Sequence, residues 1–135
     1  MLDSSWEEMR EPNAIIMILL HGTTQVRAEQ ILQHGPSPRF QEPGGQAWED
    51  GFSMQVEAGP YLFGRPEDYA RGKARAFPDE GGSVILVVDV PDDIVQAVND
   101  WFPVSQGLVQ FDPGAGLEEL IAAWPILFKE IRSVT

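Results

Sequence analysis

One histidine of this sequence stands where a ligand could reach it. His21 follows seven consecutive apolar residues, 14–20, and precedes Gly22 and the hydroxyl side chains of Thr23 and Thr24. Imidazole donates or accepts hydrogen bonds near neutral pH, and glycine lets another group approach the backbone closely. The pattern therefore favours a binding site at a junction between a strand and a helix. A histidine satisfied at a strand end would give the same pattern, so both interpretations stay open.

A tyrosine and a group of cations form a second candidate site. Tyr61 precedes four of the nine Lys and Arg residues of the chain: Arg65, Arg71, Lys73 and Arg75. In a sequence of net charge −12, this is the one concentration of positive charge. The alternative is a solvated helix face, which is the usual meaning of such a run of charges.

Several kinds of catalytic site are excluded by composition and spacing. The sequence has no cysteine, so disulfides, thiolate zinc sites and a cysteine nucleophile are absent. His21 and His34 fall on different predicted elements at a spacing that metal ligands do not use. No phosphate-binding loop, dinucleotide fingerprint or nucleophile elbow occurs in the sequence. We therefore expect no metal site.

The apolar pattern predicts strands and helices that would position these residues. Apolar, β-branched runs bounded by glycine or proline indicate strands at 14–20, 52–56, 59–63, 83–90 and 108–111. Helical spacing follows Thr23 or Thr24, either of which can cap a helix, and follows Pro66 as far as residue 77. A short helix or turn is predicted after Asp92, and a loop over 36–51. Residues 117–124 have helical propensity, whereas 126–134 alternates only in part.

Length and charge limit the class of protein. We expect an acidic N-terminal extension over 1–13 and a single domain over 14–135, a length that can bury a core of its own. The negative net charge opposes nonspecific attraction to nucleic acid and anionic lipid. The run 14–20 is too short to span a bilayer, and its acidic flank is unlike a signal peptide. With no cysteine, this pattern favours a cytoplasmic protein without membrane contact, and secretion as an effector stays open.

Taken in order, these segments resemble the ADP-ribosyltransferase superfamily over residues 17–134. The motifs that carry the resemblance are His21-Gly22-Thr23, Gly59-Pro60-Tyr61-Leu62, Asp68-Tyr69-Ala70 and a late glutamate followed by apolar residues. They are similar to the branch of diphtheria toxin and the poly(ADP-ribose) polymerases, which uses a histidine, a tyrosine and a glutamate on separate strands. The resemblance implies an α+β fold with a split sheet, in which two small antiparallel sheets form an NAD-binding cleft. RNA 2′-phosphotransferases share the His-Gly-Thr motif but continue with a histidine-rich strand where this chain has Gly59-Pro60-Tyr61.

The resemblance also implies how NAD would be held. His21 would hydrogen-bond a ribose hydroxyl, the backbone of Gly22 would hold the nicotinamide carboxamide, and Thr23 would be a supporting polar contact. Tyr61 would stack on the nicotinamide ring. The second aromatic face would come from Tyr69 or from Phe63.

Charged residues complete the implied site. We expect Arg65 and Arg71 to be the cations nearest the NAD phosphates. Glu119, followed by Leu120 and Ile121, would be the catalytic residue that binds the ribose hydroxyl and stabilises the oxocarbenium-like charge as nicotinamide leaves. On a strand, Glu118 would face the other side, so only one of the two carboxylates could serve.

The function implied first is NAD-dependent ADP-ribosyl transfer. In this reaction nicotinamide is released and ADP-ribose passes to an acceptor, a protein or a nucleic acid, that the sequence does not identify. A noncatalytic nucleotide- or protein-binding module with a degenerate ADP-ribosyltransferase fold is the alternative. A toxin effector domain paired with an immunity protein is a third interpretation.

Overall fold

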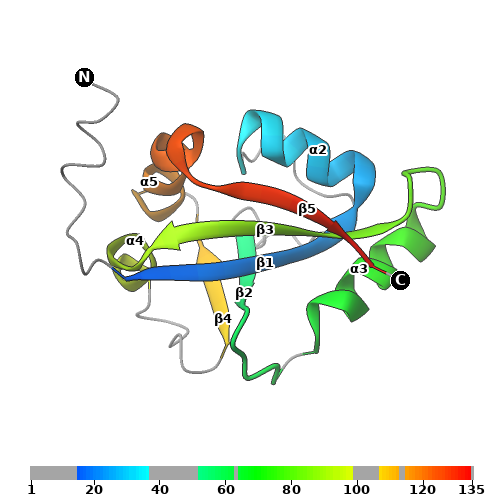
Figure 1. Ribbon diagram of the computed structural model, residues 1–135, viewed down its shortest axis with the longest axis horizontal. Coiled ribbons are helices and arrows are strands. Elements are labelled where there is room, and N and C mark those ends of the chain that lie inside the picture. The colour runs from blue at the N-terminus through cyan, green and yellow to red at the C-terminus, as the bar shows by residue number, and fades with distance from the viewer. Residues whose placement is uncertain (1–14, 37–51, 63, 99–106, 113–114, 135) are drawn as a thin grey trace.

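The computed structural model describes residues 15–36, 52–62, 64–98, 107–112 and 115–134 (Figure 1). The predicted extension 1–13, nearly all of the predicted loop 36–51 and Phe63 lie outside the described residues. The strands are β1 (Ile16–Thr24), β2 (Phe52–Val56), β3 (Ser83–Pro91), β4 (Leu108–Phe111) and β5 (Lys129–Ser133). The helices are α2 (Gln25–His34), α3 (Pro66–Ala76), α4 (Asp92–Ala97), α5 (Ala115–Ala123) and the 3-10 turn η3 (Trp124–Ile126).

The five strands form one antiparallel sheet in the order β4-β2-β1-β3-β5. β1 pairs with β3 over its whole length, whereas its register with β2 covers Leu19↔Val56 and Leu20↔Gln55. The predicted α+β class is therefore confirmed. The expectation of two separate small sheets is not met in the described residues, because these two residue pairs join the β4–β2 pair to the β1–β3–β5 group.

Strand alternation gives this sheet two unlike faces. We call one the core face: Leu19, Met54, Leu86 and Val109 point from it into a cluster that residues of α2, α4 and α5 complete. The opposite face, which we call the pocket face, carries a small buried cluster that includes Leu20, Ile85 and Val87. Figure 1 shows α2 and α5 on one side of β1 and β3, and α3 on the other. The pocket face is thus covered by one helix instead of three.

Local sequence signals position the two helices next to β1. Thr24 caps α2, its Oγ1 accepting a hydrogen bond from the backbone N–H of Arg27 (3.4 Å). The same hydroxyl donates to Glu80 Oε1 (2.8 Å), which also lies 2.7 Å from Arg27 Nε. These bonds fasten the start of α2 to the turn before β3. α3 begins with Pro66 in its first turn, as the sequence predicts.

Two segments differ from the sequence-based prediction. Residues 59–62 form no strand, because the N–H of Gly59 closes a turn onto the carbonyl of Val56 (2.9 Å) and Gly59 takes a φ of 80°. Residues 129–133, whose alternation is only partial, form the edge strand β5. Edge strands have one strand neighbour and carry weaker patterns of burial, which explains why the alternation is incomplete.

Candidate binding site

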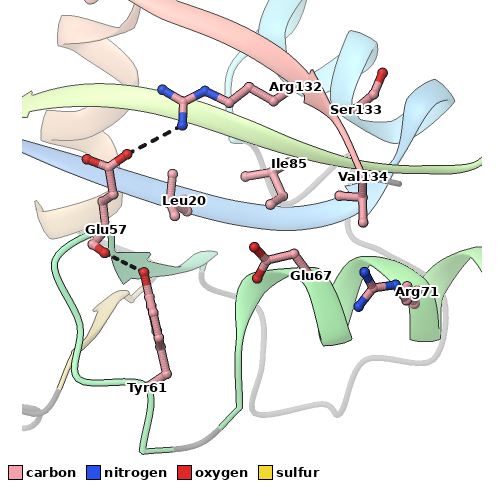
Figure 2. Close-up of a pocket in the computed structure, with 9 residues that line it drawn as sticks. All are labelled: Leu20, Glu57, Tyr61, Glu67, Arg71, Ile85, Arg132, Ser133 and Val134. Carbon is pink, nitrogen blue, oxygen red and sulfur yellow. Dashed lines mark hydrogen bonds and ion pairs between the residues drawn. The ribbon is translucent and has the colours of Figure 1, made fainter.

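A pocket of about 390 Å³ opens on the pocket face, between the sheet and α3 (Figure 2). Its floor is apolar, because Leu20 of β1 and Ile85 of β3 point out of the same face and Val134 follows β5 beside them. Tyr61 forms a wall, and the remaining lining residues are polar or charged: Glu57, Glu67, Arg71, Arg132 and Ser133. The pocket therefore combines an aromatic ring, an apolar floor and charges of both signs.

Tyr61 is held in place at both ends of its side chain. The turn that follows β2 carries it, and its hydroxyl donates a hydrogen bond to the backbone carbonyl of Glu57. The Arg65 guanidinium carbon lies 5.0 Å from the centre of the ring, within the range of a cation–π contact. The phenol is thus oriented before any ligand arrives, with a guanidinium over its ring and part of the side chain lining the pocket.

Arg132 lines the pocket from the edge strand β5. In Figure 2 its side chain extends from β5 over the floor toward Glu57. Its Nε lies 2.8 Å from Glu130 Oε2, and its Nη1 lies 3.4 Å from Glu57 Oε2. The hydrogen bond to Glu130 raises the pKa of Arg132 above its usual value, and desolvation opposes this change. A charged guanidinium, held between two carboxylates, therefore lines the pocket.

The first turns of α3 supply the remaining charged wall. Oε1 of Glu67 is shielded from solvent and has no hydrogen-bond partner among the described residues, and Arg65 Nε lies 3.7 Å from it. Arg71 lies one helical turn further on, with Nη1 3.6 Å from Asp68 Oδ1. Figure 2 shows Glu67 and Arg71 on the helix below the floor residues. Oε1 of Glu67 has the Arg65 ion pair but no hydrogen bond within the described residues, so it can accept one from a ligand hydroxyl or amide.

The predicted site between His21 and Tyr61 does not form. His21 follows Leu20 on β1, so its side chain points to the core face while Leu20 and Tyr61 line the pocket. There, Nδ1 of His21 lies 2.9 Å from the carbonyl of Ser53, and its ring centre lies 4.5 Å from that of Phe52. His21 thus lies inside β1, which continues to Thr24 instead of ending after residue 20 as predicted, and its ring is hydrogen-bonded and packed on the core face.

Gly22 and Thr23 serve the packing of β1. A Cβ at Gly22 would come within 2.2 Å of the Pro66 carbonyl oxygen, so α3 lies directly on this glycine. Thr23 points to the core face and is fully buried. Gly22 is therefore needed because a helix backbone crosses it, which is a different reason from the ligand contact that the resemblance implies.

The backbone N–H and C=O groups of Gly22 point away from β3. The bonds Gln25 N–H to Gly82 O (3.0 Å) and Asp92 N–H to Ile15 O (2.8 Å) show that odd-numbered residues of β1 bond to β3. Even-numbered residues therefore point their N–H and C=O groups toward β2. Since the β1–β2 register ends at Leu20, these groups of Gly22 lie beyond it.

Of the other implied cofactor contacts, Arg71 reaches the pocket and Tyr69 does not. Tyr69 is on α3 with 46% of its surface exposed, and its ring lies beside Gly64. Arg65 contacts the pocket indirectly, through the Tyr61 ring. The second implied aromatic, Phe63, lies outside the described residues.

The assignment of Glu119 to a catalytic strand is wrong. Residues 115–123 form helix α5, in which Leu117 and Leu120 are buried in the core face and both Glu118 and Glu119 are exposed. The apolar residues recur at helical spacing, so they turn toward the sheet and leave the two carboxylates in solvent. Because α5 contributes to the core face, Glu119 lies on the other side of the sheet from the pocket.

Sequence reasoning missed four charged residues at the pocket: Glu57, Glu67, Glu130 and Arg132. One signal could have found two of them. In Lys129-Glu130-Ile131-Arg132-Ser133, the polar residues at alternate positions share one face of an extended strand. The other two depend on how the turn after β2 and the start of α3 pack, which no local pattern shows.

The described residues also bear on metal binding and on membrane insertion. Among the described residues, no group of three or more histidine or carboxylate side chains is placed to hold a metal ion. In the same part of the chain, no helix has the length and apolar character needed to cross a bilayer.

Comparisons with protein-family models, with curated proteins and with solved structures gave no match to this chain. Function can therefore be inferred only from the residues of the chain itself and from the chemistry of the Tyr61 pocket.

Proposed function

We propose that this chain is a nucleotide-binding module of the ADP-ribosyltransferase type, and that it binds NAD or a closely related nucleotide in the Tyr61 pocket. One observation carries the proposal. Tyr61 and Arg71, to which the resemblance assigns the nicotinamide ring and the phosphates, line the same pocket. They come from different segments, a turn and a helix, and both line the pocket whose floor is apolar.

A nucleotide has the mixed chemistry that the pocket presents. A flat ring can stack on Tyr61, and sugar carbons can lie on Leu20 and Ile85. Sugar hydroxyls can donate to the carboxylate of Glu67, and phosphates can accept from guanidinium groups. The volume of about 390 Å³ falls inside the range of about 300–1,000 Å³ that is usual for small-molecule sites.

The backbone of β1 supports NAD among the nucleotides. A carboxamide pairs with one N–H and one C=O, and the Gly22 groups of both kinds point away from β3 at a position beyond the β1–β2 register. His21 has no part in this proposal, since its side chain lies on the core face.

ADP-ribosyl transfer is the second candidate function, and carboxylates at the pocket favour it. Glu57 and Glu67 line the pocket, and Glu130 is hydrogen-bonded to Arg132. A carboxylate next to the scissile bond would stabilise the oxocarbenium-like charge that develops as nicotinamide leaves. Glu119 cannot do this from α5. A binding module is placed first because the residue assigned to catalysis is absent from the pocket.

Binding is tested by titrating the protein with NAD, ADP-ribose and nicotinamide, using NMR shifts and the melting temperature. We expect shifts at Tyr61, Leu20 and Ile85, and a rise in melting temperature, since a ligand of the folded state stabilises it. Tyr61→Ala should weaken binding by about tenfold or more, because stacking on an aromatic ring contributes about 1–3 kcal/mol per base. Phe128→Ala is the control, as Phe128 is an exposed aromatic outside the pocket lining. NAD at millimolar concentration without any shift at these residues would refute the proposal.

Catalysis is tested separately by nicotinamide release. If the chain is an enzyme, Glu67→Gln should lower turnover by about a hundredfold with little change in NAD affinity, because the charge acts mainly in the transition state. If NAD binds at Tyr61 but nicotinamide is released only at the background rate, the chain is a binding module and the proposal of catalysis is refuted.

A further inference from the structure

The ion pair between Arg132 and Glu57 suggests how the pocket handles a negatively charged ligand. The two groups come from distant parts of the sheet, the edge strand β5 and the turn after β2, and they meet over the floor residue Leu20 (Figure 2). Both side chains line the pocket together with its apolar floor. A ligand that fills the pocket would therefore contact this ion pair.

The two carboxylates that hold Arg132 are not equivalent. Glu130 is two positions away on β5 and accepts from Nε at 2.8 Å, a normal length for a charge-assisted hydrogen bond. Glu57 accepts from Nη1 at 3.4 Å, near the limit of a hydrogen bond. Glu130 thus fixes the direction of the guanidinium, and Glu57 makes the weaker contact on the side that faces the pocket.

We propose that Arg132 is a second phosphate-binding residue of the pocket, in addition to Arg71, and that the Glu57 carboxylate occupies the anion position at Arg132 until a phosphate or diphosphate ester replaces it. This proposal rests on the proposed function for the identity of the nucleotide. The exchange of one anion for another is inferred from the geometry of Arg132. The planar guanidinium keeps its Glu130 bond and turns its Nη groups from a carboxylate to a phosphate, which offers the same acceptor geometry.

The exchange is physically easy because the pair is exposed. The side chains of Arg132 and Glu57 have 49% and 39% of their surface accessible to solvent, so water and salt screen their attraction. The other charged groups that line the pocket are Glu67 and Arg71. In a chain of net charge −12, a carboxylate that already neutralises Arg132 also opposes weakly held anions. We therefore expect a doubly charged phosphate to displace Glu57 from Arg132 more easily than a singly charged carboxylate does.

The experiment measures the affinity of the intact chain for inorganic pyrophosphate, ADP-ribose and nicotinamide by NMR titration at constant ionic strength. Glu57→Gln should tighten pyrophosphate and ADP-ribose binding by about two- to fivefold, the range for an exposed ion pair. Arg132→Gln should weaken both by about tenfold or more, as expected for a charge-assisted hydrogen bond. Nicotinamide, which is neutral, should bind all variants equally. Glu118→Gln and Arg75→Gln are controls with the same charge changes outside the pocket lining.

The double variant Glu57→Gln with Arg132→Gln separates displacement from simple repulsion. If Glu57 acts by occupying Arg132, its replacement has no effect once Arg132 is gone. An equal gain in both backgrounds overturns the proposal, because Glu57 would then repel the anion directly. Absence of pyrophosphate binding also overturns it. Melting curves check that each variant folds.

These outcomes are distinct from those of the proposed function. NAD binding that depends on Tyr61 but ignores Glu57 and Arg132 would refute the exchange and leave the nucleotide site. Pyrophosphate binding in the predicted order, without NAD binding, would refute the nucleotide site and leave Arg132 as an anion site.

Discussion

Replacement of Gly22 by alanine tests the contact on which the pocket is built. The added Cβ would lie 2.2 Å from the Pro66 carbonyl oxygen and 2.9 Å from the Ala70 nitrogen. Both are backbone atoms of α3, so no side chain can rotate away. β1 is also held by its full pairing with β3, and therefore α3 must move by about 1 Å to restore a normal contact.

The expected cost follows from the rigidity of both elements. Overpacking of a core costs about 1–3 kcal/mol, and we expect about 3 kcal/mol here because backbone meets backbone. For a domain of this size, that loss lowers the melting temperature by about 10 °C. Urea unfolding and thermal melting followed by circular dichroism would measure both quantities.

A second glycine of α3 provides the matched control. Gly72 is inside the helix, and a Cβ there would have only the flexible end of Arg75 at 4.0 Å. Gly72→Ala should therefore stabilise the protein by about 0.5–1 kcal/mol, the difference in helix propensity. The two alanine variants should change stability in opposite directions. A Gly22→Ala protein within about 0.5 kcal/mol of the wild type would refute the packing of α3 on β1.

Two further predictions concern single carboxylates. Glu80→Gln should lower the free energy of unfolding by about 1–3 kcal/mol, because it removes the carboxylate charge to which the guanidinium of Arg27, 12% exposed, donates two hydrogen bonds. Urea denaturation with Glu118→Gln as the control measures this, and an equal effect of both changes would contradict it. Glu119→Gln should leave NAD affinity and any nicotinamide release unchanged within about twofold, because the residue is exposed on α5. A loss of about tenfold or more, with unchanged melting, would return Glu119 to the site.

Strong local patterns predicted most of the elements. The runs that became β1 and β3 are β-branched and apolar, and both are paired on two sides. Pro66 followed by two acidic residues marked the start of α3, and Thr24 capped α2 as one of two candidates. Where the signal was weak, the prediction failed or stayed open. The segment 59–62 is apolar enough for a strand, yet Gly59 turns it away from the sheet.

The candidate site was predicted less well, because a motif gives the order of residues and not the face on which they lie. His21 and Leu20 are adjacent in sequence, and this adjacency sends their side chains to opposite faces of β1. The position of the pocket depends on which face α3 covers. Gly22 determines this, because it lies on the same face of β1 as Leu20 and has no side chain that would keep the helix backbone away. The His-Gly pair therefore marks the strand next to the pocket, but the side chain that reaches the pocket is that of the preceding leucine.

For the same reason, the charged residues at the pocket could not be predicted from the group of cations at positions 65–75. Of the four cations between positions 65 and 75, Arg71 lines the pocket and Arg65 lies against Tyr61. The cation that crosses the floor comes from the last strand, more than fifty residues later in the chain. Its partner Glu57 follows β2, at the other side of β1 and β3 in the sheet order. Sequence proximity concentrates charge on one helix, whereas strand pairing brings opposite charges together across the sheet, and a ligand in this pocket would meet guanidinium groups from both sources.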